Sequence, residues 1–167
     1  MEKIHILLYC MKKFLILFSL LSSNAFAECN IKRPSWQTGY KGFSSTRHYV
    51  LYTQGQNIQT NSKNSVISGS WKCKYSNKLI VAQDKDEVRN KVEIDHVLPW
   101  SFFKKNAKNC DQAKLFFNDE NNLLAVDKKA NRDKTDSIDY SGYDKNIKQI
   151  ACNTCNKYSL DNCIRVC

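Results

Sequence analysis

Two residues able to do acid-base and metal chemistry, Asp95 and His96, are adjacent where an apolar segment runs into a turn marked by Pro99. Apolar residues alternate from Val92 and predict a short, half-buried strand that ends at this pair. A second stretch, 121–134, predicts a strand over 123–126, a helix N-cap at Asp127 and a short basic helix. Asn131 and Lys134 share a face of that helix with Asp127, because side chains three and four residues apart lie on one side.

These residue types suit hydrolysis of a phosphodiester. A divalent metal stabilises the charge that builds on the phosphate and on the departing oxygen. Asp95 offers an anionic ligand, Asn131 offers a neutral carbonyl oxygen, and such hard ligands favour Mg²⁺ or Mn²⁺ over Zn²⁺. His96 is the candidate general base, since an imidazole with a pKa near ~6.5 accepts a proton from water at neutral pH.

The same residues resemble the HNH or ββα-metal nuclease finger. Asp95-His96 with Pro99 close behind, Asn122, and Asn131 nine positions later followed by Lys134 carry the resemblance. It extends over roughly residues 66–140 and is similar to secreted bacterial HNH endonucleases related to the C-terminal domain of GmrSD-type restriction enzymes. Many HNH sites have a histidine where Asn131 stands, so this departure leaves the metal preference open.

The resemblance implies roles that the residues alone do not fix. It implies that His96 activates water opposite the metal-bound leaving oxygen and that Asn122 braces the loop that bears the histidine. Products with 5′-phosphate and 3′-hydroxyl ends are also implied. We expect Arg47, Arg132 and Lys134 to contact substrate phosphates, the arginines through their guanidinium groups and the lysine as a point charge.

The net charge favours one class of partner, with a basic surface that serves only solubility as the alternative. The 167 residues include 26 Lys and Arg against 16 Asp and Glu, a net charge of +10, which favours polyanions. We expect sequence-independent binding of DNA, with RNA as the other possible substrate, and a steep loss of affinity with salt. The oligomeric state does not follow from the sequence.

The N-terminal residues 1–27 are typical of a secretory signal peptide. Met11-Lys12-Lys13 precedes an apolar run over 14–21, and Ala25-Phe26-Ala27 offers a cleavage site. The apolar run is too short to span a bilayer, which requires ~20 residues. We therefore expect a mature chain from Glu28, exported to the periplasm or the medium and without stable membrane association. Removal of residues 1–27 takes away three lysines and one glutamate, so the net charge falls to +8.

Seven cysteines lie in the expected mature chain, at positions 29, 73, 110, 152, 155, 163 and 167. Disulfides are the first interpretation for an exported chain of this size, and the odd number leaves one thiol free or paired between chains. The alternative is a zinc site, because Cys152 and Cys155 are spaced as ligands and Cys163 and Cys167 nearly so. An amphipathic helix around Cys152 and Cys155 favours disulfides.

The whole pattern predicts a small, single α+β domain over 28–167, stabilised by disulfides and built around a finger core at about 92–136. A cysteine-rich helical tail follows at 143–167. We expect loops and short strands over 29–65, strands within 68–83, a loop over 84–90, and a helix over 111–117 that buries Leu115 and Phe116. Trp100, Phe102 and Phe103 are expected in the core, and Lys104, Lys105 and Lys108 in a basic loop.

Two other functions stay open. A non-catalytic secreted module could bind nucleic acid through its basic surface, and a cysteine-rich adaptor could bind zinc through its C-terminal cysteines. The first explains the charge and the second the cysteines. Neither gives a reason for Asp95, His96 and Asn131 to occur together.

Overall fold

A computed structural model describes residues 28–167, and the expected signal peptide at 1–27 lies outside this part of the chain. The elements follow one another as η1 (Tyr40–Gly42), α2 (Thr46–Gln54), β1 (Gly55–Thr60), β2 (Val66–Lys72), β3 (Leu79–Ala82), α3 (Lys85–Lys91), β4 (Val92–His96), α4 (Trp100–Asn106), η2 (Cys110–Gln112), α5 (Ala113–Phe117), η3 (Glu120–Asn122), β5 (Leu123–Asp127), α6 (Lys128–Lys134), α7 (Lys145–Lys157) and η4 (Cys163–Arg165). The fold is a small mixed α and β domain with three disulfides.

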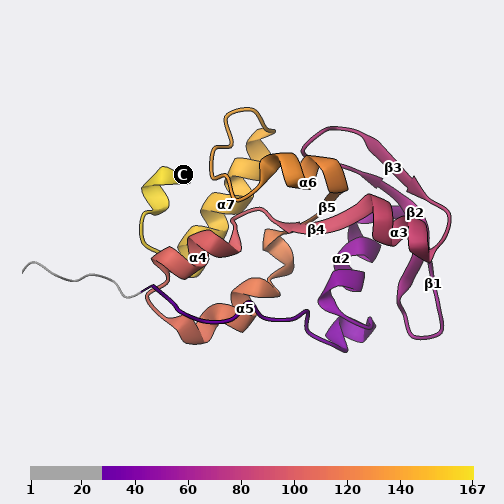
Figure 1. The fold of residues 1–167 in the computed structure, drawn as a ribbon, viewed down its shortest axis with the longest axis horizontal. Helices are drawn as coiled ribbons and strands as arrows, with labels where there is room; N and C mark the ends of the chain where they lie inside the picture. The colour runs from indigo at the N-terminus through magenta and orange to yellow at the C-terminus, as the bar shows by residue number, and fades with distance from the viewer. Residues whose placement is uncertain (1–27) are drawn as a thin grey trace, which may run out of the picture.

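Two antiparallel sheets form the β-structure. One has the strand order β1-β2-β3, and the other consists of β4 and β5. Figure 1 shows the three-stranded sheet with α2 and α3 at one end of the molecule and α4, α5 and α7 at the other, with β4 and β5 between them. The end of β4, where Asp95 and His96 stand, therefore lies where the two ends of the domain meet.

The second sheet is set by the alternation of side chains along β4. Val92, Ile94 and His96 are buried, while Glu93 and Asp95 are half-buried on the opposite face. Asp95 pairs with Leu124 and His96 with Leu123 on β5. Asp127 then caps α6, because its side chain accepts the amides of Lys129 and Ala130. The two predicted strands and the N-cap at Asp127 agree with the structure.

Three other elements differ from the sequence predictions. Residues 46–54 form helix α2, not loops and short strands, and bury Val50 and Leu51 on one face. Residues 85–91 form helix α3, not a loop, because Asp84 caps it by accepting the amides of Asp86 and Glu87. Lys104 and Lys105 belong to helix α4, which buries Phe102 and Phe103.

The predicted helix over 111–117 is partly right. Residues 110–112 form a 3-10 turn and α5 covers 113–117. Phe116 is buried in the aromatic core beside Phe103, but Leu115 is 67% exposed, so the prediction that it is buried was wrong. The strands at β2 and β3, with a turn at Asn77, and the helix α7 agree with the predictions.

Six of the seven cysteines form disulfides, which was the first of the two interpretations. Cys29 pairs with Cys110, Cys152 with Cys167, and Cys155 with Cys163. Cys73 is the free thiol and is buried. The four cysteines of the zinc alternative are thus all oxidised. Within residues 28–167, no helix combines the length and apolar character needed to cross a bilayer.

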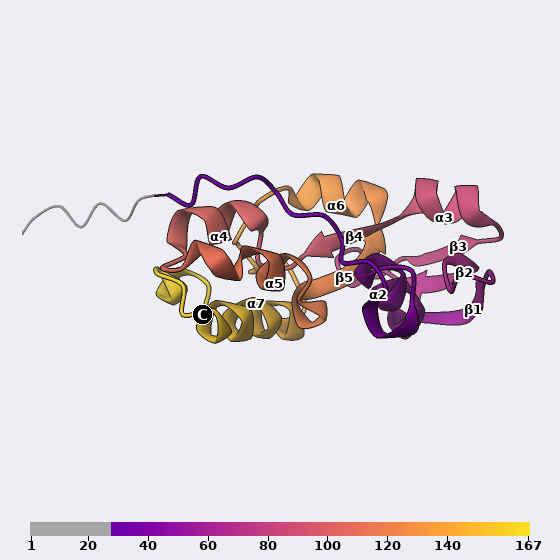
Figure 2. The same cartoon turned by 90° about the horizontal axis from the view of Figure 1, so that it is seen from below.

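The first disulfide fixes an extended N-terminal segment to the body of the domain. Figure 2 shows this segment passing along α4 and α5 and then reaching α2. The amide of Cys29 donates to the carbonyl of Lys104, and the amide of Gln37 donates to Asn118 Oδ1. The segment 29–37 is therefore held at both ends, and the residues between them lie next to the end of β4.

Candidate active site

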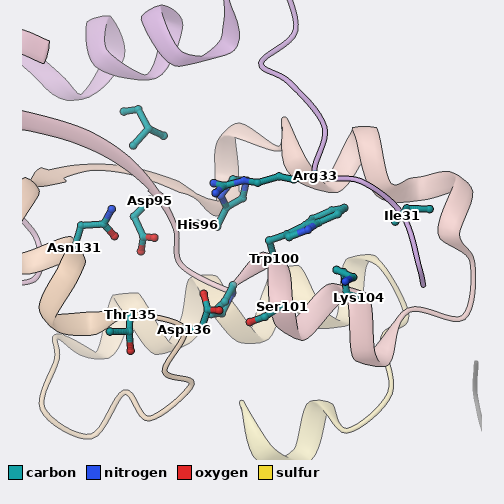
Figure 3. Close-up of a pocket in the computed structure, with 12 residues that line it drawn as sticks. Ile31, Arg33, Asp95, His96, Trp100, Ser101, Lys104, Asn131, Thr135 and Asp136 are labelled. Atoms are coloured by element: carbon teal, nitrogen blue, oxygen red, sulfur yellow. The ribbon is translucent and has the colours of Figure 1, made fainter. Parts of the chain in front are cut away.

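A cleft of about 530 Å³ opens where the N-terminal segment, β4, α4 and α6 meet. Its lining residues are Ile31, Arg33, Ile94, Asp95, His96, Pro99, Trp100, Ser101, Lys104, Asn131, Thr135 and Asp136. Figure 3 shows the side chains of Asp95, His96 and Asn131 along one side of this cleft. The structure thus brings together a carboxylate, an imidazole and a carboxamide from β4 and α6.

His96 is held in one tautomer. Its Nε2 lies 2.8 Å from the carbonyl oxygen of Phe117, and a carbonyl can only accept a hydrogen bond. Nε2 therefore carries the proton, and Nδ1 keeps its lone pair. The ring is 4% exposed and stacks on Trp36 with a centroid distance of 5.7 Å and an angle of 6°. This packing fixes the plane of the imidazole.

The imidazole is neutral at physiological pH. Burial lowers the pKa of His96 to about 4, and the positive charges of Arg33 and Lys134 act in the same direction, while the bond to Phe117 opposes them. The base form is therefore fully populated near pH 7. A neutral, oriented imidazole is the form that can accept a proton in general-base catalysis.

The carboxylate of Asp95 is supported from one side. Tyr75 donates its hydroxyl hydrogen to Oδ2 at 2.6 Å, and Lys134 Nζ lies 3.0 Å from the same oxygen. Within residues 28–167, no side chain hydrogen-bonds the second oxygen, Oδ1. Burial raises the pKa of Asp95 above its ordinary value, and Lys134 and Tyr75 oppose this by favouring the charged form.

Lys134 lies beneath the site rather than in the cleft. It is 2% exposed, and its ammonium contacts Asp95 and the carbonyl of His96 at 3.3 Å. The expected phosphate contact would need this ammonium at the surface. The charge is instead used within the protein, where it pairs with the carboxylate that it helps to hold.

Asn122 connects the turn after His96 to the start of β5. Its side chain accepts the amide of Leu98 at 2.8 Å and donates to the carbonyl of Leu98 at 3.0 Å. Its own carbonyl accepts the amide of Val97 at 2.8 Å. Asn122 is fully buried, so these bonds satisfy backbone groups that water does not reach. Its contacts are those of a brace on the loop that follows the histidine.

The two arginines named from the sequence lie outside the cleft. Arg47 is on α2 and donates to the carbonyl of Val92 at the start of β4. Burial lowers the pKa of Arg47, and Glu93 opposes this. Arg132 is exposed on α6, on a side of the helix that does not line the cleft. The structure therefore brings Asp95, His96 and Asn131 together and leaves Arg47 and Arg132 apart from them.

Arg33 is the cationic residue that the sequence analysis missed. Figure 3 shows its guanidinium reaching from the N-terminal segment to His96. Its Cζ lies 5.1 Å from the ring centroid of Phe117, and no ion pair of residues 28–167 involves it. Lys104 lines the cleft farther along α4 and pairs with Glu28 at 3.5 Å. The basic pair Lys32-Arg33 was the available signal, but nothing in the sequence placed it near β4.

The oxygen donors fit a weakly held divalent cation that keeps most of its waters. Asp95 and Asn131 supply one carboxylate and one carboxamide, and the described residues hold no group of three or more His, Cys, Asp or Glu side chains arranged around a metal position. Mg²⁺ is commonly bound by one or two carboxylates together with substrate phosphates. A closed zinc site requires four protein ligands and does not fit this set.

Comparison with known proteins supports an HNH relationship. Residues 73–110 match the model of a family described as HNH endonuclease, and this range includes Asp95 and His96 but neither Asn122 nor Asn131. A protein of Arthroderma benhamiae described as an uncharacterized secreted protein is 34% identical over 110 residues, which cover 63% of this chain and 50% of that protein. The chain thus spans about half the length of this curated relative. No solved structure matches the present chain.

Proposed function

We propose that the protein is an exported, metal-dependent endonuclease that hydrolyses DNA without sequence preference. The observation that carries the proposal is the convergence of Asp95, His96 and Asn131 on one cleft, with the proton of His96 fixed on Nε2. The HNH match over 73–110 supports the reaction class. Export is supported by the three disulfides and by the secreted relative. The narrower relationship to the GmrSD-type group and a bacterial origin stay predictions.

Each side chain then has a task that follows from its contacts. Nδ1 of His96 accepts a proton from the attacking water, because Nε2 is committed to Phe117. Asp95 and Asn131 would hold the metal, and their oxygen ligands favour Mg²⁺, with Mn²⁺ as the alternative. When bound, the metal supplies Lewis acidity to the phosphate and the leaving oxygen. The expected products carry 5′-phosphate and 3′-hydroxyl ends.

Three further residues support these tasks. Lys134 fixes Asp95 Oδ2 and favours the charged form of this half-buried carboxylate. Asn122 holds the turn that carries His96. Arg33, exposed and free of ion pairs among the described residues, binds a phosphate oxygen from the side of the histidine, because a guanidinium fork matches phosphate geometry. Arg47 and Arg132 would contact DNA only outside the cleft.

A plasmid-nicking assay tests the proposal with the oxidised full-length protein. We expect supercoiled DNA to become nicked in Mg²⁺, and EDTA or the substitution Asp95→Ala to abolish the product. The rival function, a non-catalytic basic module, predicts retardation of DNA in a gel without any nick. Retardation that is unaffected by Asp95→Ala, with no cleavage in Mg²⁺ or Mn²⁺, would establish that rival instead.

A further inference from the structure

Glu93 stands two residues before Asp95 on the same face of β4. The strand alternates strictly, so Glu93 and Asp95 both project toward α6 while Ile94 between them enters the core. β4 and α6 are in contact, and Asn131 projects from the helix toward this face. Glu93 does not line the cleft itself, but it lies next to Asn131, which does.

A hydrogen bond joins Glu93 to Asn131. Nδ2 of Asn131 donates to Oε2 of Glu93 at 2.9 Å, while Oε1 of the same carboxylate lies 3.7 Å from the ammonium of Lys128. An ionised carboxylate only accepts hydrogen bonds, so the atom of Asn131 that faces Glu93 must be the NH₂ group. The carbonyl oxygen of the carboxamide is therefore directed away from Glu93.

The carboxamide of Asn131 has the opposite orientation to the one expected if it interacted with Asp95 alone. A carboxamide has an oxygen at one corner and an NH₂ group at the other, and an isolated carboxylate attracts the NH₂ group. Figure 3 shows the opposite arrangement, with the Asn131 oxygen facing the Asp95 carboxylate. Two oxygens that face each other repel unless a cation lies between them. Glu93 thus holds Asn131 in the orientation in which its oxygen can act as a ligand.

We propose that Glu93 is a positioning residue that fixes the carboxamide of Asn131 as a metal ligand and prevents it from turning its NH₂ group onto Asp95. The inference rests on the proposed function, because it concerns the same metal site. Groups that hydrogen-bond to metal-ligating side chains strongly influence the affinity for the metal. Their removal typically weakens metal binding about 10- to 100-fold. Lys128 shares the Glu93 carboxylate and limits its movement.

The test is a titration of the oxidised full-length protein with Mn²⁺, with the free ion measured by its electron paramagnetic resonance signal. We expect Glu93→Ala to raise the dissociation constant for Mn²⁺ about 10- to 100-fold. Glu93→Gln loses the charge but keeps an acceptor oxygen for Asn131, so it should recover most of that loss. Equal weakening by the alanine and glutamine variants would show an effect of charge and overturn the inference.

A double-mutant cycle separates orientation from general damage. Asn131→Asp has oxygens at both corners and needs no orientation, so in that background Glu93→Ala should leave Mn²⁺ affinity unchanged or strengthen it by removing a like charge. The same loss in both backgrounds would overturn the proposal. Thermal denaturation of each variant checks the fold, which should persist because Glu93 is half-buried at a strand surface.

The two proposals fail differently. If the parent protein binds Mn²⁺ and loses it on Asp95→Ala, while Glu93→Ala matches the parent, then the role of Glu93 is wrong and the metal site stands. If the parent protein binds no Mn²⁺ and nicks no DNA, then the metal site is wrong and the role of Glu93 is overturned with it.

Discussion

His96 donates its Nε2 hydrogen to the carbonyl oxygen of Phe117, 21 residues later in the chain and 2.8 Å away. Substitution by glutamine keeps a donor at the position of Nε2 but removes the Nδ1 lone pair. We expect His96→Gln to keep the thermal stability of the parent within a few degrees and to lower the nicking rate about 10²- to 10⁴-fold, the usual contribution of a general base. A glutamine variant that nicks like the parent would assign the base elsewhere.

The ion pair between Lys134 and Asp95 predicts a large loss of stability when one partner is removed. Lys134 is 2% exposed and the carboxylate of Asp95 is half-buried, and breaking a buried pair by removing one partner costs about 3 to 5 kcal/mol. We expect Lys134→Met to lower the free energy of unfolding in urea by about that amount. Adding Asp95→Asn to this variant should restore much of the loss, because the remaining carboxylate charge is removed. If the second substitution instead adds a further loss, the pair is not coupled.

Asn122 predicts a similar loss by a different cause. Asn122→Ala leaves the amide and the carbonyl of Leu98 buried without partners, at a cost of at least about 2 kcal/mol. The turn after His96 should loosen, so nicking should slow while Mn²⁺ affinity at Asp95 and Asn131 changes little. Urea unfolding and Mn²⁺ titration measure the two effects separately. A loss of Mn²⁺ binding with an intact fold would place Asn122 in the metal site instead.

The disulfide between Cys29 and Cys110 predicts that reduction weakens activity through the N-terminal segment. It closes a separation of 81 residues, so its removal should cost about 4.5 kcal/mol in the chain-entropy account. We expect the double substitution of Cys29 and Cys110 by serine to slow nicking, because Arg33 and Trp36 lose their anchor beside His96.

The matched control is the disulfide between Cys155 and Cys163, which spans eight residues of the C-terminal tail. Its removal should cost about 2.5 kcal/mol and leave the nicking rate of folded protein unchanged. Arg33→Ala should slow the parent but have little further effect once Cys29 and Cys110 are serine. Equal rates in oxidised and reduced protein would contradict the dependence on the segment.

From the environment of His48 we expect the free energy of unfolding to decrease on mild acidification. Its Nδ1 accepts the amide of Val66 at 3.0 Å, and burial lowers the pKa of His48 to about 4 from the ordinary value near ~6.5. Between these values the unfolded chain binds more protons, so stability falls as the pH drops from 6.5 toward 4. His48→Asn keeps an acceptor for Val66 and cannot be protonated.

We therefore expect a smaller difference in unfolding free energy between pH 7 and pH 4.5 for His48→Asn than for the parent. Urea denaturation at the two pH values measures it. An identical pH dependence in the two proteins would show that His48 does not contribute.

The central part of the site could be predicted because its signals are local. Strict alternation along β4 and the cap at Asp127 identify the strand and the helix, and the spacing between them places Asn131 near Asp95. Helix α2 was missed because its mean hydropathy is low and only Val50 and Leu51 mark its buried face. Helix α3 was missed because the segment is mostly charged and buries only Val88, so Asp84 was not recognised as an N-cap.

The outer part of the site depends on contacts between distant residues. Arg33 reaches His96 because its segment is held at both ends, at one of them by the disulfide between Cys29 and Cys110. Seven cysteines allow many pairings that the sequence does not rank. Lys134 resembles any other lysine of a basic helix until the fold buries it behind Asp95. Glu93 similarly resembles a solvent-facing strand residue, and its bond to Asn131 requires the packing of α6 on β4.

The buried thiol of Cys73 has a consequence for maturation. In a chain that crosses a membrane from its N-terminus, Cys29 and Cys73 emerge before Cys110, yet the native bond joins the first to the third. A bond formed in order of emergence would be the wrong one. For the exported chain proposed above, correct maturation would therefore require either early burial of Cys73 or reshuffling by an isomerase.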